Sequence, residues 1–130
     1  MRKSALLLGL VFIISGCASM TAMRMTSQNR ENLSRLQVGM PRATVISIMG
    51  RCPMTVSCPQ GPDKPAKQAT IANPYRTETI QINDRKIEIV YYVLNIAEDC
   101  TVSEDSLLPM VFEDRKLIGW GKDFVIDVKK

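Results

Sequence analysis

The chain of 130 residues contains no histidine and only seven aromatic residues. Without histidine, Ser-His-Asp and Cys-His catalysis are excluded, and a zinc site would lack imidazole ligands. Its four cysteines never occur in the CxxC spacing of redox and metal-binding motifs. We therefore expect a non-enzymatic protein with no catalytic residues, no metal site and no cofactor.

The composition indicates one small folded domain, because 45% of the residues are apolar and a disordered chain would be poorer in them. The formal charge of +4 includes Arg2 and Lys3 at the N-terminus. Cleavage after residue 16 would leave 15 basic against 13 acidic residues. So small an excess gives no support to a nucleic-acid partner, and no motif indicates a small-molecule substrate.

The N-terminus has the pattern of an export signal. Met1-Arg2-Lys3 precedes an apolar run of about ten residues, whereas crossing a bilayer takes about twenty. The next segment, Ile14-Ser15-Gly16-Cys17, resembles the bacterial lipobox, in which the cysteine is acylated and becomes the first mature residue. This resemblance implies a lipoprotein signal peptide at residues 1–16 and lipidation of Cys17. An ordinary signal peptide with a cysteine at that place by chance is the alternative.

Ala18-Ser19 follows the cysteine where the lipobox pattern for inner-membrane retention has aspartate. We therefore expect the periplasmic face of the outer membrane of a Gram-negative cell, with acyl chains such as palmitate as the anchor. Each buried methylene contributes about 0.8 kcal/mol, so two or three chains hold a protein firmly. Residues 17–26 show no pattern and are predicted to be a lipidated tether, which favours membrane or envelope proteins as partners. A passive spacer is the alternative.

Residues 27–130 are predicted to form a single domain that opens with two helices. The first is expected at 27–38 and the second at 40–49, where Gly50 would end it. Gly39 would bend them into a hairpin. Arg42 lies near the positive end of the second helix, where a cation is unfavourable, so it is either a partner-binding residue or an ordinary solvated charge.

Residues 51–73 are rich in proline and are predicted to be a long loop. After the loop, alternation with a period of two predicts a half-solvated strand at 75–83. The residues at 86–95 are apolar in both alternating sets and predict a central strand, and two further strands are expected at 108–113 and 116–120. The connections are too short for parallel crossovers. The expected fold is therefore α+β, with a two-helix hairpin packed on a three- to four-stranded antiparallel meander.

Two stretches resemble a known family. The segment at 32–40, NLSRLQVGM, with Val45 and Gly50 after it, is similar to the helix signature of the SmpA/OmlA (BamE-like) outer-membrane lipoprotein superfamily. The segment at 108–121, LPMVFEDRKLIGWG, following a tyrosine-rich strand, is closer to a branch of short, uncharacterised proteobacterial lipoproteins. The resemblance implies a fold like that of BamE and β-lactamase inhibitory protein.

The resemblance implies a non-enzymatic outer-membrane lipoprotein with a scaffolding or protein-binding role in the cell envelope, in outer-membrane protein assembly or envelope integrity. The alternative is an inhibitor or binder of a soluble periplasmic enzyme, because β-lactamase inhibitory protein has a similar fold. The second helix departs from the family, which usually opens it with serine or threonine and an acidic turn. Here Pro41-Arg42-Ala43 stand in their place.

The remaining residues of interest are cysteines, aromatics and acids. Cys52 and Cys58 are expected to form a disulfide, although Cys100 could pair with either of them. Adjacent Tyr91 and Tyr92 must face opposite sides of their strand. These two tyrosines and Trp120 are either an aromatic anchor for a partner or part of the core. The acids gathered at 98–105 are interpreted as a solvated loop: Glu98, Asp99, Glu104 and Asp105.

The lipobox generates a direct prediction. Replacement of the acylated residue by Cys17→Ser should block lipid transfer and leave an unprocessed precursor with its signal peptide attached. The precursor would be detected as a heavier band in membrane fractions, with wild type as the control. Normal processing and outer-membrane fractionation of the variant would contradict the lipobox interpretation.

Overall fold

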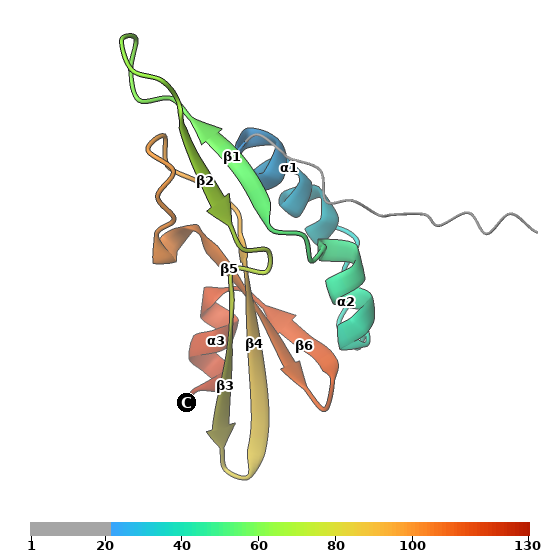
Figure 1. The fold of residues 1–130 in the computed structure, drawn as a ribbon. Coiled ribbons are helices and arrows are strands. Elements are labelled where there is room, and N and C mark those ends of the chain that lie inside the picture. The colour runs from blue at the N-terminus through green and yellow to red at the C-terminus, as the bar shows by residue number, and fades with distance from the viewer. Residues whose placement is uncertain (1–21) are drawn as a thin grey trace, which may run out of the picture.

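The structure is a computed structural model, and it describes residues 22–130. The expected signal peptide at 1–16 and Cys17 lie outside the described residues. Within the described part, no helix is long and apolar enough to cross a bilayer. The fold is α+β, with helices packed against antiparallel strands (Figure 1).

Four strands form the central sheet. They are β3 (Arg76–Ile82), β4 (Arg85–Val93), β5 (Leu107–Glu113) and β6 (Lys116–Trp120), in the order β3-β4-β5-β6 with every neighbour antiparallel. The predicted meander is therefore confirmed. Its two tight hairpins turn at residues 83–84 and 114–115, where all four residues have positive φ values of 46–65°. Two-residue turns of this kind match the twist of the strands that they join.

The central strands are buried on both faces. Along β4, Ile89 and Tyr91 belong to one apolar cluster, whereas Val90 and Tyr92 belong to another. The expectation that the two tyrosines face opposite sides is confirmed. Because each face of β4 is apolar, each face needs its own cover.

The helix α2 (Arg42–Met49) covers one face. Val45, Ile46 and Met49 are buried against β4, β5 and β6. Pro41 precedes the first turn, and Gly50 follows the last residue with φ of 97°. The predicted second helix and its glycine stop are confirmed, because proline suits a helix start and glycine tolerates this backbone conformation.

The opposite face carries a helix that was not predicted from the sequence, α3 (Lys122–Val128). Phe124, Val125 and Val128 of this helix pack on the sheet at helical spacing. A Cβ on Gly119 would come within 2.5–2.7 Å of three ring atoms of Phe124. The phenyl ring therefore lies directly on the strand backbone, and only glycine leaves room for it.

The helix α1 (Ala22–Leu33) begins earlier and ends earlier than predicted. Met25 is fully buried, and the side-chain amide of Asn29 donates a hydrogen bond of 2.8 Å to the carbonyl of Val93. The assignment of residues 22–26 to an unpatterned tether is therefore wrong, since they form the first turns of a docked helix. The single buried methionine gave too little periodicity to show this.

The prediction of a long loop at residues 51–73 is also wrong, because this segment contains a β-hairpin. Its strands β1 (Met54–Cys58) and β2 (Lys67–Ile71) pair antiparallel and form a second, two-stranded sheet. Burial alternates along β1, while the prolines lie outside both strands. In Figure 1 the hairpin extends beyond one end of the central sheet, beside α1.

The disulfide differs from the expected one. Cys58 is bonded to Cys100, with 5.6 Å between their Cα atoms, so the pairing of Cys52 with Cys58 is wrong. Residues 54–58 form an extended strand whose four residue steps cover about 13 Å, whereas the Cα atoms of a disulfide lie within about 7 Å, so the predicted small ring does not form. The bond closes a separation of 42 residues, which is worth about 4 kcal/mol in the chain-entropy model.

The contact between Gly119 and Phe124 generates a prediction. Gly119→Ala should lower the free energy of unfolding by about 1–3 kcal/mol, because the new methyl group displaces the phenyl ring. Urea denaturation followed by circular dichroism measures the change. In a Phe124→Leu background the same substitution should cost clearly less, since the smaller side chain can move. Equal costs in both backgrounds would show that the ring is not the cause.

Candidate functional site

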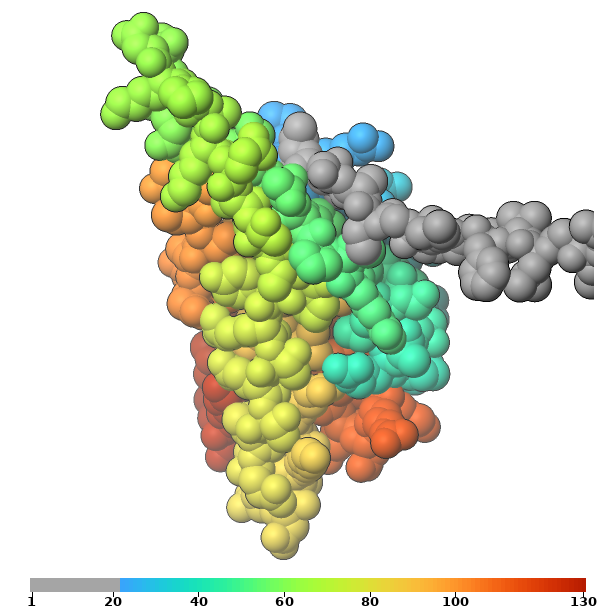
Figure 2. Space-filling view, in the orientation of Figure 1, coloured from blue at the N-terminus to red at the C-terminus, as the bar shows by residue number. Residues whose placement is uncertain are grey.

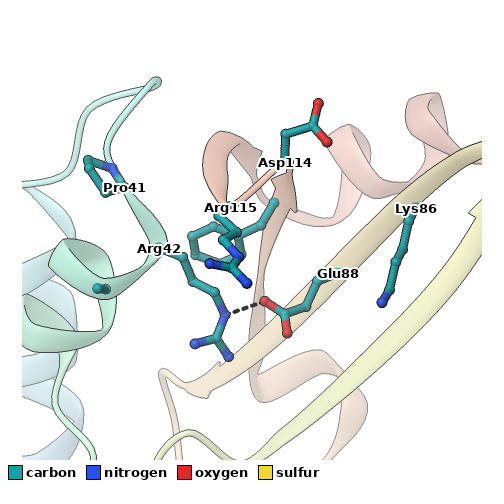
Figure 3. A pocket seen from close by; sticks show the side chains of 8 residues that line it. Pro41, Arg42, Lys86, Glu88, Asp114 and Arg115 are labelled. Carbon is teal, nitrogen blue, oxygen red and sulfur yellow. Dashed lines mark hydrogen bonds and ion pairs between the residues drawn. The ribbon is translucent and has the colours of Figure 1, made fainter.

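A groove lies beside the start of α2. It encloses about 690 Å³ and lies on the α2 side of the sheet, next to β4. Its walls come from α2 and from the hairpin turn between β5 and β6 (Figure 3). The lining residues are Pro41, Arg42, Ala43, Lys86, Glu88, Phe112, Asp114 and Arg115.

Backbone hydrogen bonds hold the two walls together. The N–H of Gly39 donates to the carbonyl of Leu117 at 2.7 Å, and the N–H of Leu117 donates to Met40 at 2.9 Å. The N–H of Arg42 then donates to the carbonyl of Arg115 at 2.7 Å. Residues 39–42 thus run along the outer edge of β6 and are not the bend of a helix hairpin. This pairing fixes the first turn of α2 against the β5–β6 turn.

An ion pair crosses the groove. Arg42 donates a hydrogen bond from Nε to Oε1 of Glu88, and their side chains are 37% and 28% exposed. A cation is unfavourable at a helix N-terminus, and the carboxylate of Glu88 offsets it. The pair is therefore held by both a strand and a helix. Arg42, named in the sequence analysis as a candidate contact, does line the site.

The groove presents charges of both signs at fixed places. Arg42, Lys86 and Arg115 are basic, whereas Glu88 and Asp114 are acidic, and the floor includes the ring of Phe112. Figure 3 shows Arg42 pointing from α2 toward Glu88, with Arg115 of the β5–β6 turn close to it. Among the eight lining residues there is no serine, threonine or cysteine. The arrangement suits recognition of charged side chains on a partner.

A second hollow of about 380 Å³ lies between α1, the end of β1 and residues 95–98. Its lining is mostly small or apolar and includes the disulfide cysteine Cys58. The lining residues are Ala22, Met23, Thr26, Ser57, Cys58, Pro59, Asn95, Ile96, Ala97 and Glu98. It brings together none of the charged side chains of the groove.

The two candidate tyrosines lie in the core. The hydroxyl of Tyr91 donates to Oε2 of Glu78 at 3.1 Å, and the guanidinium carbon of Arg76 lies 4.1 Å from the ring centroid. The hydroxyl of Tyr92 donates to the carbonyl of Gly50 at 2.9 Å. Burial raises the pKa of both, that of Tyr92 to about 12. Of the two interpretations of these tyrosines, the structure supports their place in the core, because both side chains are buried.

Trp120 is partly buried against the cluster under α2, opposite Met110 on the neighbouring strand. It is partly exposed but does not line the groove. The structure therefore does not bring it together with Arg42. Of the predicted contact residues, Arg42 alone lies in the candidate site.

The acids of the 98–105 segment act locally. Both carboxylate oxygens of Glu104 accept hydrogen bonds from Arg76, at 2.5 and 2.8 Å, and this contact holds the pKa of Glu104 below its usual value. Asp105 pairs with Lys122 at 2.7 Å, and Asp99 accepts from Thr101. Within residues 22–130, no group of three or more side chains gathers in a way that could hold a metal ion.

Sequence reasoning missed most of the groove. Lys86 and Glu88 stand two apart on a strand, and alternation alone places them on one face. This signal was available. No local pattern, however, indicates that Glu88 contacts Arg42, 46 positions earlier in the chain, or that Arg115 lines the same groove.

The hydrogen bond of Tyr92 generates a prediction. Tyr92→Phe should lower the free energy of unfolding by about 1 kcal/mol near neutral pH. In the wild type the folded state keeps the proton until about pH 12, whereas the unfolded chain loses it near 10. The free energy of unfolding of the wild type should therefore decrease as the pH rises from about 10 to about 12. The variant has no hydroxyl at this position and should lack this part of the decrease. Urea denaturation from pH 8 to 11.5 measures both slopes, and parallel slopes would contradict the prediction.

Comparison with known proteins gives one match. No curated protein and no solved structure matches the chain. A family model described as "Protein of unknown function (DUF3192)" matches residues 15–126. The match covers the end of the proposed lipobox, the whole central sheet and the groove. The chain therefore belongs to the DUF3192 family.

Proposed function

We propose that this protein is a non-enzymatic outer-membrane lipoprotein, anchored on the periplasmic face, that binds another envelope protein through the groove beside α2. Lipidation of Cys17 would supply the membrane attachment. The folded domain would supply the recognition surface. Its role would be scaffolding, in outer-membrane protein assembly or envelope integrity.

The observation that carries the proposal is the fixed pattern of charge in the groove. Arg42 and Glu88 hold one another in place, and the backbone pairing of residues 39–42 with β6 sets Arg115 beside them. Binding to charges that are already positioned loses less conformational entropy than binding to mobile ones. Complementary charges also speed encounter and exclude wrong partners.

Two further points support it. The resemblance to a lipobox supports attachment at a membrane surface, where neighbouring envelope proteins would be the available partners. The resemblance to the SmpA/OmlA superfamily implies the same fold class as the one observed, and a binding role. Likeness of fold alone is weak support for function, so the proposal depends on the groove.

Site-specific photo-cross-linking tests the proposal. A photoreactive amino acid at position 86, in the groove, should give adducts in intact cells expressing the full acylated chain. The matched control is position 129, an exposed lysine at the end of α3 on the opposite face of the sheet. Mass spectrometry of the adduct at position 86 should identify a membrane or envelope protein.

The affinity for that partner should respond to the groove charge. Lys86→Gln should weaken binding about five-fold at low salt, because a rim charge mainly steers association, and the difference should shrink at high salt. Lys129→Gln removes the same charge outside the groove and should leave binding unchanged. Equal effects of both variants, or adducts at both positions, would contradict a groove interface. A soluble periplasmic enzyme as the adduct would favour the alternative of an enzyme inhibitor.

A further inference from the structure

The central sheet has two outer edges, and within residues 22–130 the chain covers only one of them. Along β6, residues 39–42 accept and donate backbone hydrogen bonds at Arg115 and Leu117, and Pro41 pairs with Lys116. Along β3, no backbone group of the described residues bonds to the outer side. In Figure 2 the yellow residues of the β3–β4 hairpin lie open along the near side of the molecule.

The register decides which groups of β3 point outward. The two-residue turn at 83–84 makes Ile82 and Arg85 a hydrogen-bonded pair, and such pairs alternate along an antiparallel ladder. Ile80 and Glu78 therefore bond to β4 as well. The N–H and C=O groups of the residues between them point away from the sheet. These outward residues are Thr77, Thr79 and Gln81.

The side chains beside this edge differ between the two faces. Thr77, Thr79 and Gln81 line the α2 side and are exposed, which makes that row polar. Ile80 and Ile82 lie on the α3 side and are only partly buried. A strand added here would alternate in the same way, with polar side chains beside the threonines and apolar ones beside the isoleucines.

Few of the usual protections of an open edge are present in β3. Proteins block such edges with charged side chains, lysine above all, with proline or with a bulge. The charged residues of β3, Arg76 and Glu78, lie at its start and are already paired. Residues 76–82 contain neither lysine nor proline, and their pairing with β4 runs without a register shift. The shift in this sheet lies instead between β5 and β6, on the side that residues 39–42 already cover.

We propose that the outer edge of β3 binds an extended segment of a partner protein, with alternating polar and apolar residues, as an additional strand of the sheet. Recognition of extended peptides by strand addition uses main-chain hydrogen bonds for affinity and alternate side chains for specificity. This edge lies one strand away from the groove, since Thr79 and Gln81 stand opposite Glu88 and Lys86. The proposed contact uses the main-chain groups of β3 and does not depend on the groove charges.

The edge fits such a segment better than a second copy of this chain. Two copies paired symmetrically about Thr79, the register that uses the whole strand, would place Ile80 opposite Glu78 and Ile82 opposite Arg76. Each apolar side chain would then face a charged one, which is a poor cross-strand pair. Pairing about Gln81 would match the isoleucines with one another, but it runs into the turn at residues 83–84 and leaves only a short ladder. Glu78 and Arg76 are also already engaged with Tyr91 and Glu104. An alternating partner segment meets both isoleucines with apolar residues.

The test uses the full acylated chain in detergent and a labelled eight-residue peptide of alternating threonine and valine with a lysine at each end. A peptide of the same composition without alternation is the control. Saturable binding is expected for the first peptide alone. Thr79→Pro should weaken it about ten-fold, because the substitution removes an outward N–H and leaves the ladder with β4 intact. Thr79→Ala keeps that N–H and should bind within two-fold of wild type.

Hydrogen exchange of the wild type gives an independent measurement that needs no folded variant. In the free protein the amides of Thr77, Thr79 and Gln81 should exchange fast, while those of Glu78 and Ile80 exchange slowly. The peptide should slow the first set only. Unchanged exchange with peptide, or equal binding by Thr79→Pro, would overturn the proposal. If the amides of Thr77, Thr79 and Gln81 exchange slowly without peptide and this protection disappears on dilution, a second copy of the chain occupies the edge. That result would also overturn the proposal.

Discussion

Burial of the two central strands on both faces is the constraint on which the rest of this structure depends. An antiparallel sheet commonly leaves one face in water, but both faces of β4 and β5 are apolar here. Each fully buried large side chain contributes about 1.5–3 kcal/mol, so an uncovered face would be costly. Helices α2 and α3 have eight and seven residues, too short to persist alone, and exist as covers for the sheet.

Because α2 and α3 are short, they leave parts of the sheet uncovered, and ion pairs lie beside these uncovered parts. Arg85 and Glu113 form a two-bonded pair at 2.7 Å, and Arg76 and Glu104 form another. Exposed pairs of this kind contribute between about 0 and 1 kcal/mol, so their main effect is to set positions. The two surfaces that we propose for recognition, the groove and the β3 edge, lie where the covers stop.

The strands and turns of the central sheet were predictable because they follow local rules. Alternation with a period of two marks β3, continuous apolar runs mark β4 and β5, and Asn-Asp and Asp-Arg turns close the β3–β4 and β5–β6 hairpins. The hairpin at 54–71 obeys the same rule, but each of its strands has five residues and lies among prolines, so the pattern was too short to stand out. The first turns of α1 were not predicted, because Met25 is the one buried apolar residue of this mostly polar helix and a single residue shows no helical periodicity. Within the groove, Arg42 alone was foreseen.

By itself, the sequence determined the antiparallel meander, the second helix with its glycine stop, and the opposite orientation of Tyr91 and Tyr92. These features depend on neighbours a few residues apart, where backbone geometry leaves little choice. Only the tertiary structure decided that Cys58 bonds to Cys100 and that Arg42 meets Glu88, across 42 and 46 residues. It also decided which sheet edge residues 39–42 cover. A local sequence pattern gives no information about how far apart remote segments lie in the fold, so these contacts are set by tertiary packing.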